Sequence, residues 1–408
     1  MSAPEALPSP DTPLPLSAQA ALDVSGHGHL DFAELATCLP ALPHMDWSLV
    51  QRTPFMLVGL GAIGRPLALN LAYLGMKRCV LVDRKRYKPQ SRVSQCEPGE
   101  VGREKAIVVS ELVRALGVDA TGLAEDIEYL APGYVEPETV VIVSADNRQA
   151  DIAAGRLAAM MRQRCVKVNV APEYLMASIR CYDLRSPEPP VCVECQIREE
   201  QYAEEPNPHS CEGGPEQATG SPRALCQFAA NAAALVVAQL VASPDYWAPR
   251  WYGRQWQQML LGGFGCMLTL APKQNCRWEH ARHWQNLRRL ATGPAQTRLS
   301  DLAALAGTDG DRQMMRVRFS GRVASSGRCN RCHQDRHILR WLARLDEPVG
   351  KCACGGKLEA QPFFTYHDLP AQELQEVWNV PLADWGVAPL SVVCLENRGQ
   401  AWSFVLGK

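Results

Sequence analysis

The sequence predicts an α/β fold built on a doubly wound, mostly parallel sheet. Two observations carry this prediction: short apolar runs alternate with helical patterns over residues 55–184, and a glycine-rich turn joins the first run to the first helix. Apolar residues make up 47% of the 408 residues and charged residues 21%, which excludes a disordered or fibrous protein. The net charge of −1 also excludes a polycation that binds nucleic acid along its whole length.

The predicted elements follow one another as alternating strands and helices, and end with a strand, a long loop and a buried helix. Strands are expected at 55–59, 79–83, 140–144, 165–170 and 175–184, and helices at 63–74, 105–116, 150–162 and 224–241. The loop at 185–222 is rich in Pro, Glu and Gly, and a loop of that length is usually functional or disordered. A small β-hairpin is expected within 381–406.

Three regions are predicted along the chain: 1–50, 51–294 and 295–408. The first holds a Pro-rich tail and a twelve-residue frame at 23–34 that resembles a degenerate EF-hand calcium loop. His27 stands at a ligand position of this frame and is a poor ligand for a hard cation, so a capped helix–turn–helix is favoured over calcium binding. No apolar run reaches the roughly 18 residues of a membrane span, and residues 1–20 carry no signal-peptide pattern. We therefore expect a cytoplasmic protein with no membrane partner, in which clustered cysteines indicate metal or catalysis.

The glycine-rich turn carries Gly59, Gly61 and Gly64 between a strand and a helix, and Asp83 ends the next strand. Glycines allow a phosphate to approach the backbone, the helix N-terminus favours its negative charge, and the carboxylate can bind ribose hydroxyls. A nicotinamide-dependent dehydrogenase would show the same pair of features.

Three further motifs favour one superfamily: SRVSQ at 91–95, VGREKA at 101–106 and SADN at 144–147. With the glycine turn and Asp83, they resemble the ThiF/MoeB/ubiquitin-activating superfamily over about residues 50–285. The segment PLADWGVAPL at 381–390 is most similar to bacterial ubiquitin-like activating enzymes of antiviral (Bil-type) operons, which are homodimers. In the family's arginine-containing segment, Ser94 falls at the arginine position and Arg92 lies two residues earlier.

The resemblance implies a Rossmann-like adenylation domain that binds ATP and Mg²⁺ and joins the C-terminal carboxylate of a ubiquitin-like protein to AMP. By the same resemblance Lys105 contacts the phosphates, Asp146 holds Mg²⁺, Asp83 binds the ribose, and Arg92 supplies a phosphate contact, with Arg65 as a further candidate. The alternative for Lys105 is a solvated helix residue, and for Asp146 a helix N-cap.

Two cysteine constellations predict zinc, so the expected fold includes an embedded zinc site and a small C-terminal zinc ribbon. The first joins Cys192 and Cys195 to Cys276 and His280, with His283 as a spare ligand. The second is formed by the close pairs Cys329, Cys332 and Cys352, Cys354. The alternative for the first set is a group of buried apolar cysteines.

Cys211 lies in the polar loop away from any paired cysteine, where thioester-forming relatives carry their nucleophile. Cys226 is the rival candidate at the start of an apolar helix, and its alternative is a buried small hydrophobic residue. We favour Cys211, with the possibility left open that neither cysteine is catalytic.

The predicted function is ATP-dependent activation of a ubiquitin-like protein that ends in a thioester, with a conjugating-enzyme-like protein as the next partner. The alternatives are a tRNA-modifying relative, an activator of a sulfur carrier, a non-catalytic nucleotide-binding scaffold and, last, a dehydrogenase. Residues 250–344 carry 16 Arg and 1 Lys against 5 acidic residues, a net charge of +12, so nucleic acid is a second-choice partner. The simpler reading is an Arg-rich face that pairs with the acidic part of the same chain.

Overall fold

The computed structural model describes residues 44–89, 91, 96–186, 189, 191–203, 223–260, 262–308, 312–344 and 347–408. The chain divides into two compact units, Met1–Pro40 and Ala41–Lys408, and the first lies wholly outside the described residues. The calcium-type frame at 23–34, Arg92 and Cys211 also lie outside them.

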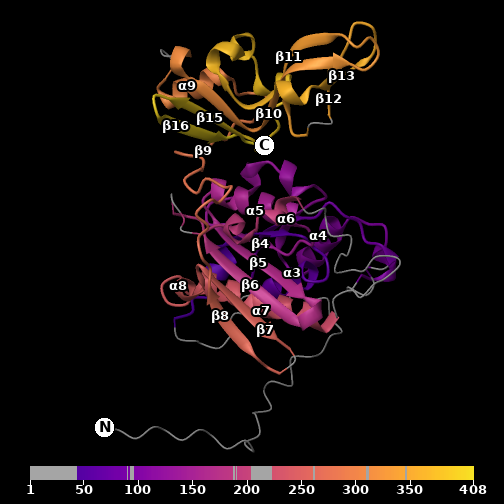
Figure 1. Cartoon of the computed structure of the whole chain (residues 1–408), viewed down its shortest axis with the longest axis vertical. Helices are drawn as coiled ribbons and strands as arrows, with labels where there is room; N and C mark the ends of the chain where they lie inside the picture. Colours follow the sequence, from indigo (N-terminus) through magenta and orange to yellow (C-terminus); the bar gives the residue numbers. More distant parts are fainter. Residues whose placement is uncertain are drawn as a thin grey trace, which may run out of the picture. The chain divides into compact units, whose positions relative to one another are not determined.

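The first sheet has eight strands in the order β3-β2-β1-β4-β5-β6-β7-β8. The first five run parallel and the last three antiparallel, which confirms the mostly parallel sheet. Figure 1 labels β4 to β8 of this sheet. The bounds are β1 Pro54–Val58, β2 Arg78–Val82, β3 Asp119–Leu123, β4 Val140–Val143, β5 Arg164–Ala171, β6 Met176–Asp183, β7 Arg254–Met259 and β8 Gly265–Thr269. β1 and β4 are buried along their whole length, as expected of parallel strands covered on both faces.

Helices cover both faces of this sheet. Residues of α3, α4 and α7 share one apolar core with side chains from one face, and α5 packs on the other. The bounds are α2 Ser48–Arg52, α3 Gly64–Tyr73, α4 Lys105–Ala115, α5 Arg148–Met160, α6 Glu200–Ala203, α7 Arg223–Ala242 and α8 Ala248–Trp251. Every strand and helix predicted in this part is confirmed to within two residues at each end.

One described helix, α7, is long and apolar enough to cross a membrane by length and composition alone. Its most apolar window is 61% buried inside the protein, against α3 and strands β5 and β6. It therefore has the packing of a core helix.

The second sheet is antiparallel except at one edge and contains the ribbon. Its main path is β12-β13-β10-β15-β16-β9, and β11 and β14 also pair with β10. The bounds are β9 Arg288–Arg289, β10 Arg316–Cys329, β11 Asp335–Leu342, β12 Pro348–Lys351, β13 Lys357–Ala360, β14 Thr365–Pro370, β15 Val392–Asn397 and β16 Gln400–Val405, with helix α9 at Leu299–Ala306. The predicted C-terminal hairpin is confirmed as β15 and β16.

The two sheets share a core. The cluster that holds Val141 of β4 and Leu157 of α5 also contains Cys394 of β15 and Val405 of β16. β9 follows the first cysteine–histidine set in the chain and pairs in parallel with β16. The C-terminal sheet is thereby tied to the first domain by main-chain bonds and by buried apolar contacts.

Candidate nucleotide-binding site and metal clusters

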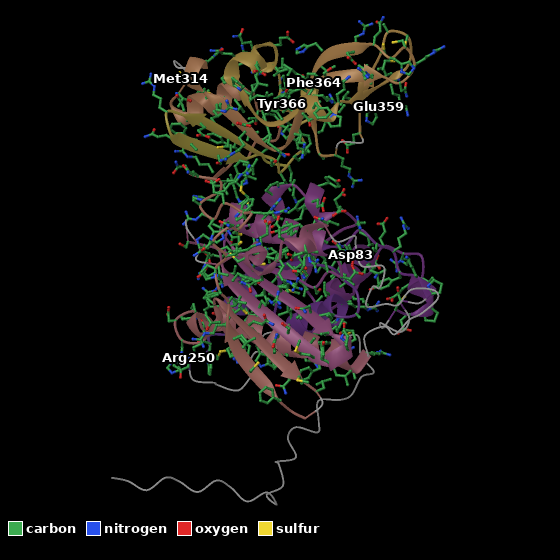
Figure 2. The ribbon with its side chains drawn as sticks, in the orientation of Figure 1. Asp83, Arg250, Met314, Glu359, Phe364 and Tyr366 are labelled. Atoms are coloured by element: carbon green, nitrogen blue, oxygen red, sulfur yellow. The ribbon has the colours of Figure 1, made fainter. Side chains whose placement is uncertain are left out.

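A pocket opens at the carboxyl ends of β1, β2 and β4. The strand order reverses between β1 and β4, and open α/β sheets bind ligands at such a reversal. Its lining includes Gly61 after β1, Asp83 and Lys85 after β2, and Asp146 after β4; Figure 2 labels Asp83 in the α/β domain. Lys105, from the VGREKA motif, also lines the pocket, so the structure gathers four widely spaced sequence motifs at one place.

The glycine-rich turn lies directly against the segment that follows β4. Gly59 has a φ of +85°, and a Cβ on it would lie 2.7 Å from the Ala145 backbone. A Cβ on Gly64 would lie 1.9 Å from the Gly59 carbonyl oxygen, and Ser144 Oγ donates to the same oxygen at 2.8 Å. Only glycine fits at these two positions, so the backbone at the start of α3 stays accessible to a ligand.

Asp83 is held by main-chain hydrogen bonds on both carboxylate oxygens. Leu60 N–H donates to Oδ2 at 2.7 Å, and Lys85 N–H donates to Oδ1 at 2.8 Å. Burial raises the pKa of the Asp83 carboxyl, against the opposing effects of the Lys105 charge and of these two bonds. Each oxygen keeps a lone pair, so the carboxylate can still accept hydroxyl groups.

Lys105 is the first residue of α4 and is 2% exposed. Its Nζ lies 5.4 Å from the centroid of the Tyr87 ring, and its charge acts on Asp83. The reading of Lys105 as a solvated helix residue is therefore wrong. Its ammonium belongs to the pocket, where it can meet a phosphate.

Asp146 and Asn147 divide two tasks at the start of α5. Asn147 is the N-cap, and its Oδ1 accepts from Ala150 N–H at 2.7 Å. Asp146 faces Lys85, whose Nζ donates to Oδ1 at 2.9 Å and to Oδ2 at 2.7 Å. The N-cap alternative for Asp146 is thus wrong, and Lys85 is a pocket residue that the sequence motifs did not identify.

Arg65 has a structural partner. It is 6% exposed and forms a two-pronged ion pair with Glu100 at 2.5 and 3.1 Å, with its guanidinium 5.4 Å from the Tyr87 ring centroid. It is not among the described residues that line the pocket. The phosphate role considered for Arg65 is therefore not supported by its contacts.

The first cysteine–histidine set gathers as the spacing predicts. Cys192, Cys195, Cys276 and His280 place their ligand atoms within 4.8 Å of one another. Cys192 Sγ lies 3.6 Å from Cys276 Sγ, and Cys195 Sγ lies 3.3 Å from His280 Nε2. The hydrogen bond from the neighbouring Cys192 thiol lowers the pKa of Cys195. His283 is half-buried and turns its Nδ1 to the Ala281 carbonyl, so the cluster contains His280 and not the spare ligand.

The second set gathers in the ribbon. Cys329 Sγ lies 3.4 Å from Cys354 Sγ, and Cys332 Sγ lies 3.7 Å from Cys352 Sγ. Backbone N–H groups of Cys332 and Arg331 point at the Cys329 sulfur and lower the pKa of that thiol to about 6.

Both clusters have the dimensions of a tetrahedral zinc site. Zn–S bonds of about 2.3 Å place the sulfurs of a tetrahedron roughly 3.8 Å apart, close to the separations found here. Zinc would join the start of the 185–222 loop to the segment that follows β8 in the first cluster, and the turns of β10–β11 and β12–β13 in the second.

The remaining site predictions have different outcomes. Cys226 is 1% exposed in the first-turn region of α7 and belongs to the apolar core, which favours its reading as a buried hydrophobic residue. In the basic stretch, Arg316 pairs with Asp368, Arg328 with Asp335, and Arg344 with Glu125 of the first domain. Part of the basic stretch is therefore partnered within the chain, as the reading of an Arg-rich face predicts.

A family model gives the same picture as the geometry. The model described as "ThiF family" matches residues 40–276, which is more than half of the chain. The chain belongs to the ThiF family. Membership supports an ATP-dependent adenylating enzyme, as the motifs at the pocket predict.

Solved structures similar to this ThiF-family protein include three crystal structures. Escherichia coli MccB with succinimide is 16% identical, over 57% of this chain and 68% of that one, with a TM-score of 0.43. E. coli MccB with ATP is 15% identical, over 57% and 67%, with a TM-score of 0.45. PaaA is 14% identical, over 55% and 66%, with a TM-score of 0.41. No curated protein matches the chain.

Proposed function

We propose that this ThiF-family protein adenylates the C-terminal carboxylate of a ubiquitin-like protein and then holds it as a thioester on Cys211. The observation that carries the first half is the pocket in which Asp83, Lys105 and Asp146 meet beside the glycine-rich turn. In this proposal residues 51–294 form the adenylation domain, and residues 295–408 form a ribbon-bearing domain that helps to select the partner. We further propose that the protein acts as a homodimer in a reducing cytoplasm.

The chain's residues have separate tasks in the first step. The partner's carboxylate attacks the α-phosphorus of ATP, a new C–O–P link forms, and the bond to pyrophosphate breaks. Lys105 and the N-terminus of α3 favour the negative charge that gathers on the phosphates. Asp83 orients the ribose through its free lone pairs. A bound Mg²⁺ would neutralise phosphate charge, and Asp146 is the carboxylate that would hold it.

The second step uses a thiolate. Cys211, after losing its proton to solvent, attacks the acyl-adenylate carbonyl; a C–S bond forms and AMP leaves. Two observations support Cys211 as the nucleophile. It lies in the sequence between the metal-cluster residue Cys195 and helix α7, and the rival Cys226 is buried. A conjugating-enzyme-like protein would then accept the acyl group by thiol exchange.

The nucleotide half is tested by thermal unfolding with MgATP, NAD and NADP in turn. A ligand that binds only the folded state at 100 times its dissociation constant stabilises it by about 2.7 kcal/mol. We expect MgATP alone to raise the Tm of the wild type, Asp146→Ala to abolish the shift, and the exposed-residue control Asp119→Ala to retain it. Stabilisation by NAD alone would refute the adenylation proposal.

The thioester half needs the partner protein and two variants. Cys211→Ser with ATP and the ubiquitin-like protein is expected to form the adenylate without a thioester that thiols can reduce. Cys266→Ser is the matched control, because Cys266 is half-buried on β8 and belongs to neither metal cluster. An undiminished thioester in Cys211→Ser would show that another residue is the nucleophile.

A further inference from the structure

Lys85 occupies the position on Asp146 that a metal ion would need. Its ammonium nitrogen contacts both carboxylate oxygens, at 2.7 and 2.9 Å, inside the pocket. A cation bridging two carboxylate oxygens leaves little room for a second one on the same side. The pocket thus carries a positive charge of its own at the carboxylate assigned to the nucleotide's metal ion.

The main chain of Lys85 is fixed, whereas its side chain can leave. Its N–H donates to Asp83 Oδ1 at 2.8 Å, and its carbonyl accepts from Lys105 N–H at 3.1 Å. The side chains of Lys85 and Asp146 are 37% and 24% exposed, and ion pairs this open to solvent contribute little free energy. Four rotatable bonds let the ammonium move to a nearby anion without any change of backbone.

A bound nucleotide would supply that anion. The triphosphate of ATP brings several negative charges into a pocket whose lining already includes Lys105 and Lys85. The phosphates would compete with Asp146 for the Lys85 ammonium, and a divalent cation could then take the place on Asp146 that the ammonium leaves. After this exchange the Lys85 ammonium is paired with the phosphates, and the Asp146 carboxylate is paired with the divalent cation.

We propose that Lys85 is a second phosphate-binding lysine that rests on Asp146 in the nucleotide-free protein and transfers to the phosphates when the nucleotide binds, which frees Asp146 for a divalent cation. This inference rests on the proposed adenylation function and adds a catalytic residue to it. Lys85 competes with the metal ion before the nucleotide binds and acts beside Lys105 afterwards. The resting pair also keeps Asp146 neutralised and oriented into the pocket.

The inference predicts opposite effects on two binding reactions. Lys85→Met removes the competitor of the metal ion, so nucleotide-free protein should bind Mn²⁺, followed by electron paramagnetic resonance, about fivefold more tightly. The same variant loses a charged partner of the phosphates, so ATP in the presence of EDTA should bind at least tenfold more weakly by calorimetry. Lys85→Arg should restore most of the ATP affinity, because it keeps the charge.

Two controls separate this role from a general effect on folding. Lys88→Met changes an exposed lysine in the same segment that does not line the pocket, and it should bind Mn²⁺ and ATP as the wild type does. Asp146→Asn should lose Mn²⁺ binding and retain ATP binding in EDTA. A merely structural ion pair would weaken both reactions together in Lys85→Met.

The outcomes distinguish the inference from the function on which it rests. The role of Lys85 is overturned if the Lys85→Met variant binds Mn²⁺ and metal-free ATP as the wild type does, or if it loses both. In either case, MgATP binding by the wild type would still support adenylation. Wild-type protein that binds ATP neither with a metal ion nor without one overturns both.

Discussion

Leu60 N–H and Asp83 Oδ2 are joined by a 2.7 Å hydrogen bond, so the glycine-rich turn and the carboxylate proposed to bind ribose position each other. In the proposed site the turn would present its backbone to the phosphates, and the same turn helps to fix the group that would hold the sugar. Substitutions on either side of this bond should therefore affect nucleotide binding together.

Asp83→Ala is expected to weaken MgATP binding at least tenfold, because a charged acceptor for ribose and the acceptor of Leu60 N–H are lost together. Calorimetric titration with MgATP measures the change. Asp119→Ala, at an exposed residue of the edge strand β3, is the control. Unchanged affinity in Asp83→Ala would assign the ribose to another residue.

The pH dependence of MgATP binding should reflect the ionisation of the Asp83 carboxyl group. Burial raises the pKa of Asp83, so the folded protein takes up this proton at higher pH than the unfolded chain does. The ionised carboxylate therefore costs stability, in full above the folded-state pKa, and that cost is lost as the pH falls from there to the unfolded-state pKa. Protonation also removes an acceptor, so MgATP affinity should fall over the same interval, above the usual range of aspartate. Asp83→Asn should lack this transition, and a persisting transition would assign it to another group.

Gly64→Ala should abolish nucleotide binding and lower the Tm. Its new Cβ would lie 1.9 Å from the Gly59 carbonyl oxygen, a backbone atom that cannot move without opening the turn. Gly99→Ala is the matched control, because no atom lies within 4 Å of a Cβ there. Thermal unfolding with and without MgATP reads out both effects, and normal MgATP stabilisation of Gly64→Ala would contradict them.

Arg65→Met should destabilise the fold by about 3 kcal/mol, because it leaves the Glu100 carboxylate buried without its partner. The side chains of this pair are 7% and 13% exposed. Arg103→Met breaks the more exposed pair with Glu111 and should cost less than about 1 kcal/mol. Urea unfolding compares the two. Equal losses of unfolding free energy in the two variants would show that the Arg65–Glu100 pair contributes no more to stability than the exposed pair.

Two zinc ions per chain are expected in metal analysis of the purified protein, one for each cluster. His280→Ala should reduce the content to about one, since a tetrahedral site loses its fourth ligand. His283→Ala should retain both, because His283 lies outside the cluster. If His283→Ala loses one zinc ion and His280→Ala keeps both, His283 is the fourth ligand in place of His280.

Local patterns were enough to predict most of the first domain. Strands such as β4 are continuous apolar runs, and the helices between them repeat at helical spacing, so neither depends on distant contacts. The cysteine ligands were also predictable, since pairs two residues apart already set half of a tetrahedron. β3 was missed because its sequence, DATGL, has no apolar run; the strand lies at the sheet edge, and two of its five residues are exposed.

Interactions between distant residues were not predictable. The segment 84–88 has the composition of a solvated basic turn, and only the fold brings Lys85 to Asp146, 61 residues away. The partner of Arg65 lies 35 residues away at Glu100, so a local motif could not separate a phosphate contact from an ion pair. The choice between His280 and His283 likewise depends on where the Cys192 turn folds back.

The apolar core shared by β4, α5, β15 and β16 has a thermodynamic consequence. Removing the C-terminal strands would expose side chains of the adenylation domain, so the two sheets cannot melt independently. A single calorimetric transition is expected for residues 41–408, and damage to the last strands should be transmitted to nucleotide affinity. The C-terminal region thus acts as a structural brace of the catalytic half, and not as a tethered accessory.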